Sequence, residues 1–520
     1  MGYVLAMYDI RGKQDFIYRR TKVKEIIGAS QIIRDCFKDY LYDAAEKVCK
    51  EKGASTKTTG ICTYKIKEVK EDKCIYEVGE KFSKGEFEKH LGDGYIGEVV
   101  YDGGGNFFVL FKDMDSYKAT NKIFYRSLLK EIGSLRVLTS YLEIENLDDY
   151  KRDEKELRER HRQNEQRECA IHPVNTLPIV QTDYMDSMPL VRRHIENLAD
   201  DNKVSLESFA KYEKYHEYSQ RKSKTNPDVT EFDKMVEKKG VDSHLAVIYI
   251  DGNSMGAKVE QTINGKKSYE ECINALRDFS ASIQENYIDT PIKAIDNYLS
   301  SQKVDAKRYV VYAGDEITLI CNAKHAFNIV KEYFKALPDG GKGNATSCAG
   351  VAIFHSHAPY SDAYRIAEEC CESGKQLMKN EKIKNACFMD FQYLQGAVGV
   401  SLDEIREKDH VADLCKPWAY RSDKKADFET FEDVEKMETI LKIIARGNTK
   451  DLLQYAKSNK ERYELEIERI IAHCKNEEDK KKLNDDKDFL KEHRELLYRM
   501  MLVFDLWFKE EKSDKEAQDD

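Results

Sequence analysis

The hydrophobic positions of this sequence form two strand-rich stretches, followed by a stretch with helical periodicity. The first opens with an apolar strand-like run, Tyr3 to Ile10, which leads into a helical pattern that reaches about Cys49. Residues 97–111, GEVVYDGGGNFFVLF, place two β-type runs on either side of consecutive glycines, which predicts a hairpin. A helix and a strand at about residues 136–144 complete this stretch.

The second strand-rich stretch repeats this plan. It begins with LAVIYI at residues 245–250, a continuous apolar run that is typical of a strand buried on both faces. The remaining expected elements are strands at 308–312, 317–321 and 346–354, and helices at about 268–286, 326–337 and 361–378. The resulting order, β-α-β-β-α-β, predicts a ferredoxin-like domain of the palm type.

These patterns predict an α+β protein with four parts. An almost entirely charged run, residues 151–168, marks a boundary after the first strand-rich stretch. From about Ser401 onward we expect long charged helices and no further strands. The expected parts are a first ferredoxin-like palm domain at 1–145, an intervening mostly helical module at 146–240, a second palm domain at 241–395 and a C-terminal helical domain at 396–520.

Composition narrows the class of protein. The 520 residues include 85 basic and 95 acidic side chains, which argues against a wholly basic nucleic-acid clamp but allows a local basic pocket. The 13 cysteines include no C-x-x-C pair, so we expect reduced thiols in a cytoplasmic protein and no zinc ribbon. No long apolar stretch and no leader-like N-terminus are present, so we expect no membrane contact.

Three acidic residues stand at the ends of strands in the second stretch. Asp251 ends the run LAVIYI, and Asp315 and Glu316 follow Gly314 in the next expected hairpin. Carboxylates that converge in this way repel one another unless divalent cations neutralise them. Two Mg²⁺ or Mn²⁺ ions there would activate a ribose 3′-hydroxyl and stabilise charge on the attacked phosphate. Aspartate and glycine also form ordinary turns, but an acid that ends a buried strand beside an acidic hairpin favours an active site.

Several segments resemble one protein family, in the same order along the chain. YIDGNSMG, VVYAGDEITLI and AGVAIFHSHAPYSDAYRIAEECCESGK resemble the second palm of the large polymerase-like subunit of type III CRISPR effector complexes, which is related to GGDEF nucleotide cyclases. YDIRGKQDFIYRRTKVKEIIGASQII and YDGGGNFFVLF resemble that family's first palm, which is degenerate because it lacks the metal-binding acids. Accordingly, Gly105 and Asn106 stand where the second palm has Asp315 and Glu316.

The resemblance implies a nucleotidyltransferase that converts ATP or another nucleoside triphosphate into a cyclic di- or oligonucleotide messenger for antiviral defence. It implies that Asp251, Asp315 and Glu316 are metal ligands, with Glu316 alternatively acting as the base for the 3′-hydroxyl. The nucleotide-binding residues that it implies are Lys375, which would grip the triphosphate, and Gly314, Gly252 and Asn253. The expected partners are the nucleotide, a second copy of the chain or other CRISPR or defence proteins, and binding of RNA or DNA is left open.

The sequence departs from the family pattern in several places. Ala313 stands where the first of two glycines usually precedes the acids, and Asn253 replaces the second acid of the first motif. No His-Asp dyad precedes the first palm, and Cys169 stands alone where the family has zinc-binding cysteines between the palms. We therefore expect a trimmed member of the family without an HD nuclease domain.

Two other functions stay open. A diguanylate-cyclase-like enzyme would use GTP, but Val259 and Ser268, at the positions where such enzymes read guanine, lack the expected amide and carboxylate. A noncatalytic scaffold would bind a nucleotide or partner proteins, but such a protein has no need of three clustered acids.

Overall fold

The chain folds into two compact units. The computed structural model describes residues 2–20, 22–51, 60–63, 66–70, 73–76, 81–103, 106–167, 179–191, 204–222, 232–236, 243–304, 306–341, 345–394, 396, 399–422, 428–444 and 446–508. The first unit comprises Met1–Thr230, Ser254–Ile288 and Val310–Asp315, and the second comprises Glu231–Asn253, Asp289–Tyr309 and Glu316–Asp520. The chain thus passes repeatedly between the units, and the four parts expected from the sequence stay a prediction.

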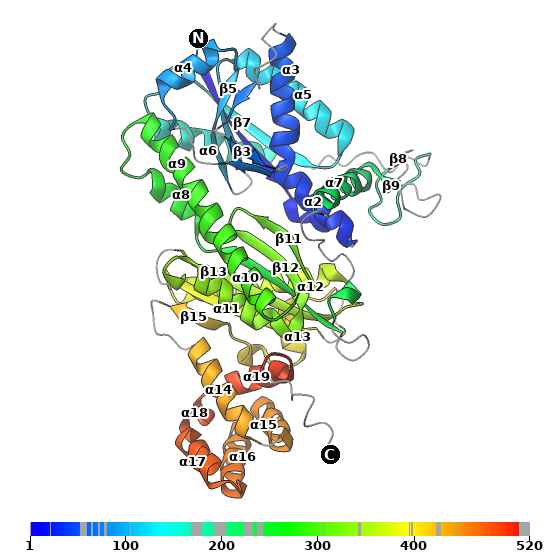
Figure 1. The fold of residues 1–520 in the computed structure, drawn as a ribbon, viewed down its shortest axis with the longest axis vertical. Coiled ribbons are helices and arrows are strands. Elements are labelled where there is room, and N and C mark those ends of the chain that lie inside the picture. The colour runs from blue at the N-terminus through cyan, green and yellow to red at the C-terminus, as the bar shows by residue number, and fades with distance from the viewer. Residues whose placement is uncertain are drawn as a thin grey trace. The chain divides into compact units, whose positions relative to one another are not determined.

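The first unit contains a five-stranded mixed sheet in the order β2-β5-β6-β1-β7 (Figure 1). Its strands are β1 (Tyr3–Arg11), β2 (Ile61–Cys62), β5 (Gly97–Gly103), β6 (Asn106–Phe111) and β7 (Arg136–Ile144). Its helices are α1 (Lys13–Tyr18), α2 (Val23–Cys36), α3 (Tyr42–Glu51), α4 (Lys84–Gly92), α5 (Met114–Glu131), α6 (Tyr150–Arg167), α7 (Leu206–Lys222), α8 (Met255–Ile263) and α9 (Tyr269–Ile283). Two small ribbons pair β3 (Ile66–Lys70) with β4 (Lys73–Tyr76), and β8 (Leu190–Val191) with β9 (Val204–Ser205).

A six-stranded mixed sheet organises the second palm, in the order β11-β12-β10-β13-β14-β15 (Figure 1). Its strands are β10 (His244–Gly252), β11 (Lys307–Ala313), β12 (Glu316–Asn322), β13 (Ser347–His355), β14 (Ala386–Tyr393) and β15 (Trp418–Ser422). The helices that accompany it are α10 (Thr290–Ser301), α11 (Ala326–Ala336), α12 (Tyr360–Asn380) and α13 (Leu402–Lys408). The C-terminal helices are α14 (Phe431–Ile443), α15 (Arg446–Ser458), α16 (Lys460–His473), α17 (Glu477–Asp485), α18 (Lys487–Glu492) and α19 (Arg494–Trp507).

The central strand β10 and the helix α12 form the core of the second palm. Residues 245–250 of β10 are all buried, as the continuous apolar run predicts for a strand flanked on both sides. Helix α12 packs on β10, β13 and β14 through residues at helical spacing. These residues are Ala363, Ile366, Ala367, Cys370, Cys371, Gly374 and Met378.

The order of elements expected for the second palm is confirmed, and one expectation about the C-terminal residues is wrong. The order β-α-β-β-α-β runs from β10 to β13, and α12 and β14 follow it; β10 is antiparallel to β12 and β13. No strand was expected after about Ser401, yet β15 pairs antiparallel with β14. The sequence pattern does not predict β15, because this strand is only five residues long and ends in two polar residues, Arg421 and Ser422.

The first sheet confirms the hairpin expected at residues 97–111, as β5 and β6. Gly104 and Gly105 at its tip lie outside the described residues, as does Cys169. The comparison of Gly105 with Asp315 therefore stays a prediction.

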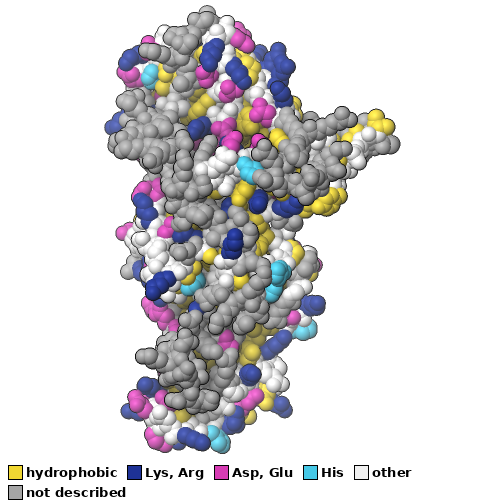
Figure 2. Space-filling view, turned by 45° about the vertical axis from the view of Figure 1, so that its right-hand side comes forward, with side chains coloured by type: hydrophobic (Ala, Val, Ile, Leu, Met, Phe, Trp, Pro, Cys, Tyr) yellow, Lys and Arg dark blue, Asp and Glu magenta, His cyan; other side chains and the backbone are white. Residues whose placement is uncertain are grey.

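The surface carries charges of both signs. Figure 2 shows basic and acidic side chains interspersed over one face of the molecule, in keeping with 85 basic and 95 acidic residues in the sequence. Within the parts of the chain that the structure describes, no helix combines the length and the apolar character needed to cross a bilayer.

A buried ion cluster ties the C-terminal helices to the second sheet. Asp390 on β14 is fully buried and pairs with Arg406 of α13 at 3.0 Å and with Arg499 of α19 at 2.8 Å. Burial alone would raise the pKa of Asp390, but the two guanidinium groups outweigh it and hold that pKa below its ordinary value. Arg499 also donates to the Phe391 carbonyl at 2.7 Å and lies over the Phe391 ring. The cluster joins three elements that are distant in sequence.

We expect Asp390→Ala to lower the free energy of unfolding by about 3–5 kcal/mol, because it leaves two buried guanidinium groups without their carboxylate. Urea denaturation of the full chain measures this loss. The exposed Asp413 in the same segment supplies the control, and Asp413→Ala should change stability by less than about 0.5 kcal/mol. Equal stability of the two variants would contradict the role given to the cluster.

A second ion pair gives the C-terminal region a pH dependence. The pKa of His493 is raised above its ordinary value, chiefly by its hydrogen bond with Glu429. A raised pKa stabilises the fold fully below the unfolded pKa of about 6.5, and this contribution disappears as the pH rises through the folded pKa. We expect Glu429→Gln to cost up to about 1 kcal/mol at about pH 6 and less at about pH 9. Urea denaturation at both pH values tests the sign, and a cost that grows toward alkaline pH would contradict it.

Candidate active site

Two carboxylates face each other across the pair β10–β12. Asp251 of β10 is the register partner of Glu316 of β12, and both side chains are half-buried. Directly paired residues in an antiparallel sheet point to the same face, with Cβ atoms about 4.5–5.5 Å apart. The sheet register therefore brings two of the three predicted acids together.

Asp315 occupies the turn that joins β11 to β12. Gly314 and Asp315 are the only residues between Ala313 and Glu316, and Gly314 has φ +67°. Two-residue hairpin loops of this kind place a glycine first because the left-handed region is unfavourable for other residues. The turn thus sets Asp315 directly beside Glu316 in the chain.

Lys375 of α12 reaches the same place from the helix that covers the sheet. Its ammonium group forms an ion pair and hydrogen bond with the Asp251 carboxylate, and each side chain is 26% exposed. Burial would lower the pKa of Lys375, but the Asp251 carboxylate outweighs it and raises the pKa above its ordinary value. Lys375 is therefore a cation at neutral pH, held against one of the predicted metal ligands.

Two glycines allow α12 to lie close enough for this contact. A Cβ atom on Gly350 of β13 would come within 1.8 Å of the Ala367 carbonyl oxygen of α12. A Cβ atom on Gly374 would meet Phe388 at 3.1 Å and the sulfur of Cys348 at 3.3 Å. Cys348 is the other register partner of Asp251, so this packing holds Lys375 next to the acid.

Gly252 and Asn253 continue the chain beyond Asp251. Gly252 is the last residue of β10, opposite Ser347. Asn253 is buried, and its amide group donates to Thr346 Oγ1 at 3.2 Å and to the Ala386 carbonyl at 2.9 Å. Asn253 thereby braces the loop after β10, and its contact with a nucleotide stays a prediction.

Sequence reasoning missed Tyr249 and Glu368, which lie near the acids. Tyr249 precedes Asp251 by two residues on the same face of β10, and burial, Glu316 and Asp251 together raise its pKa. On α12, burial and the neighbouring carboxylates of Glu369 and Asp251 raise the pKa of Glu368. The spacing of Glu368 and Lys375, seven residues apart, places both on one helix face and would have been the signal.

The corresponding position in the first unit has different chemistry. Asp9 of β1 is the register partner of Asn106 of β6, as Asp251 is of Glu316. Arg11 donates to Asp9 at 3.0 Å, and His161 Nε2 lies 3.6 Å from it. Burial opposes the ionised form, but His161 and Arg11 outweigh it and lower the pKa of Asp9. One carboxylate thus stands here among basic groups, opposite an amide.

The residues at the second-unit site fit a hard divalent cation. Mg²⁺ prefers carboxylate oxygens together with phosphate oxygens and water. Asp251 and Glu316 supply carboxylates on one face of the sheet, and Lys375 holds a positive charge against Asp251. Clustered carboxylates repel one another unless a positive charge lies among them, and either an ammonium group or a metal ion can supply that charge.

Comparison with known proteins gives a family for this segment. The family model described as Cas10/Cmr2, second palm domain, matches residues 244–387. No curated protein sequence matches the chain. The chain is similar to solved structures entitled apo Csm1-Csm4 cassette (TM-score 0.50) and Csm1-Csm4 cassette in complex with cA4 (TM-score 0.48), at 12% identity in each case. Each alignment covers 96% of this chain and 70% of the other. The resemblance of the second strand-rich stretch is confirmed: residues 244–387 match the second palm domain of the Cas10/Cmr2 family.

Proposed function

We propose that this chain is a metal-dependent nucleotidyltransferase that joins ATP, or another nucleoside triphosphate, into a cyclic di- or oligonucleotide. Each 3′-hydroxyl forms a bond to an α-phosphate, and the bond to pyrophosphate breaks. The observation that carries the proposal is the pairing of Asp251 with Glu316 in a Cas10/Cmr2 second palm, with Lys375 in contact with Asp251. One matched structure is of a Csm1-Csm4 cassette in complex with cA4, and it is part of the proposal that this chain also handles a cyclic nucleotide.

The residues of the site have separate roles in this proposal. Asp251 and Asp315 bind Mg²⁺ or Mn²⁺, and Glu316 either completes the ligand set or accepts the proton of the attacking 3′-hydroxyl. The ions, when bound, supply the positive charge that stabilises the phosphate under attack. Lys375 exchanges the Asp251 carboxylate for a phosphate of the triphosphate, since an ammonium group can neutralise either anion.

The first unit would have no metal-dependent chemistry of its own. Its sheet order β5-β6-β1-β7 corresponds to β11-β12-β10-β13, which supports a duplicated palm. Asp9 is held by Arg11 and faces Asn106, so this position offers a single carboxylate that already has a basic partner. We propose that this degenerate palm serves as a partner surface or holds an acceptor nucleotide.

GTP specificity of the diguanylate-cyclase type has less support. Ser268 is the N-cap of α9, where its side chain accepts from the Glu271 amide at 3.1 Å within a capping box. Val259 packs against the apolar core of the first unit. Both positions at which guanine would be read therefore have structural roles, which favours ATP or a broader choice of nucleotide.

The protein partners are also a proposal. The matched structures contain Csm1 with Csm4, one of them within a type III-A CRISPR-Csm interference complex. We propose that this chain works beside other CRISPR or defence proteins, or beside a second copy of itself.

We expect Asp315→Ala and Asp251→Ala each to lower product formation by about 10²–10³-fold or more, because a transition-state contact and a metal ligand are lost. The double variant should lose far less than the product of the two effects, since both acids hold the same ions. Incubation with each nucleoside triphosphate and Mg²⁺ or Mn²⁺, followed by mass analysis, measures the product. Asp278→Ala, which removes an exposed carboxylate from α9, is the control. Wild-type turnover by a folded double variant would place the catalytic centre elsewhere.

Lys375→Met should affect metal and nucleotide in opposite directions. Without nucleotide, Mn²⁺ affinity should rise about two- to fivefold, because the ammonium group no longer competes for Asp251 and a partly exposed pair is worth up to about 1 kcal/mol. With nucleotide, affinity for the triphosphate should fall, because the phosphate loses its cation. Calorimetric titration measures both, with Lys379→Met, an exposed lysine on the same helix, as the control. A variant that weakens both or neither would contradict the exchange.

A further inference from the structure

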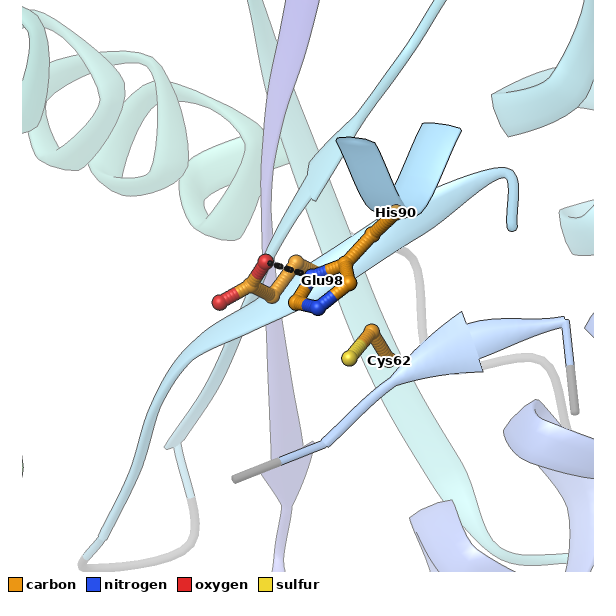
Figure 3. Close-up of side chains that lie close together, drawn as sticks. All are labelled: Cys62, His90 and Glu98. Carbon is orange, nitrogen blue, oxygen red and sulfur yellow. Dashed lines mark hydrogen bonds and ion pairs between the residues drawn. The ribbon is translucent and has the colours of Figure 1, made fainter. Parts of the chain in front are cut away.

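A second group of potential metal ligands lies in the first unit, apart from the acids of the second palm. Cys62 of β2, His90 of α4 and Glu98 of β5 each offer one ligand atom, and these atoms lie within 4.8 Å of one another. Figure 3 shows the three side chains pointing toward one another, with the hydrogen bond between His90 and Glu98 drawn as a dashed line. The proposed nucleotidyl transfer uses none of them.

The sheet register brings two of these three potential ligands together. Cys62 and Glu98 are partners in the parallel pair β2–β5, so their side chains lie side by side on one face. His90, in the last turn of α4, reaches Glu98 Oε2 with its Nδ1 at 3.0 Å. Three elements thus converge through one side chain each.

Arg277 orients the carboxylate in this group. Its guanidinium contacts Glu98 Oε1 at 3.0 Å and donates to the carbonyls of Val99 and Val100 at 2.5 Å and 3.2 Å. The other oxygen, Oε2, is the one that faces His90. A carboxylate that binds a metal through one oxygen commonly accepts a hydrogen bond at the other, which fixes its orientation.

We propose that Cys62, His90 and Glu98 form a zinc site, with water as the fourth ligand. Thiolate, imidazole and carboxylate are the three side-chain types that bind Zn²⁺, and a thiolate disfavours Mg²⁺ and Ca²⁺. Bond lengths of 2.0–2.3 Å in a tetrahedron put ligand atoms roughly 3.3–3.8 Å apart. Small side-chain movements from the observed positions suffice, and binding replaces the His90–Glu98 hydrogen bond and releases the thiol proton of Cys62.

The site would fasten an edge strand that has few other bonds. Strand β2 contains only Ile61 and Cys62 and stands at one end of the strand order β2-β5-β6-β1-β7. A strand this short makes few ladder hydrogen bonds, so a metal bonded to Cys62, His90 and Glu98 would join β2, α4 and β5 directly. This role is structural and does not depend on the function proposed for the second palm.

The other cluster with this composition has a simpler explanation. Glu429, Asp433 and His493 also lie within 4.8 Å of one another. Asp433, however, accepts hydrogen bonds from both the amide and the hydroxyl of Thr430 in the capping box of α14, and Glu429 pairs with His493. These contacts account for the positions of all three residues, so this cluster serves as the comparison.

Metal analysis of the full-length chain, purified after Zn²⁺ loading and dialysis, tests the proposal. We expect one zinc ion per chain in the wild type and in His493→Gln, and loss of that ion in Cys62→Ser and His90→Gln. Cys474→Ser, which removes another partly exposed thiol, should retain the ion. Retention by both Cys62→Ser and His90→Gln, or loss in His493→Gln alone, would overturn the assignment.

Two further measurements test the thiolate ligand, and the second needs no variant and so stays valid if one fails to fold. Co²⁺ in place of Zn²⁺ should give a thiolate-to-metal charge-transfer band in the wild type and in Cys474→Ser, and no such band in Cys62→Ser. In the unmutated chain, Zn²⁺ should slow alkylation of Cys62, mapped by mass spectrometry, and leave the rate at Cys474 unchanged. Equal alkylation of Cys62 with and without Zn²⁺ would overturn the proposal.

Discussion

The candidate site depends on how closely α12 can approach the sheet. Gly350 of β13 leaves room for the Ala367 carbonyl, and a methyl group there would overlap it at 1.8 Å. This contact places Lys375 against Asp251 and sets the helix face that also carries Glu368. A helix displaced outward by one side-chain layer would take the ammonium group of Lys375 away from Asp251. The close packing of α12 on the backbone of β13 therefore sets the geometry of the site and the positions of its charged side chains.

Much of the fold could be predicted because the strands of the second palm are continuous apolar runs. Such a run is typical of a strand covered on both faces, and β10 is buried along residues 245–250. Strand β15 could not be found in this way, because it lies at a sheet edge and only its first residues are buried. The cluster of Asp390, Arg406 and Arg499 could not be predicted either, because pairing between residues distant in sequence leaves no local pattern.

The candidate site was predictable to the extent that chain position determines it. Asp251 at a strand end and Glu316 at the start of the next hairpin strand follow from the sequence, and the register then pairs them. The role of Lys375 was predicted only from the resemblance to the family, because a lysine on an amphipathic helix ordinarily faces water. The bracing role of Asn253 depends on Thr346 and Ala386, which are remote in sequence and which only the three-dimensional structure brings to it.

Strand β15 ties the palm to the residues that follow it in a way that limits how the chain can be divided. Because β15 belongs to the C-terminal segment yet pairs with β14, cutting the chain between β14 and β15 would strip a strand from the sheet. The backbone N–H and C=O groups of β14 would then form an open edge, which invites pairing with other molecules. An exchange of the C-terminal helices that kept the sheet intact would have to leave β15 with β14. The structural unit is thus larger than the family-matched residues 244–387.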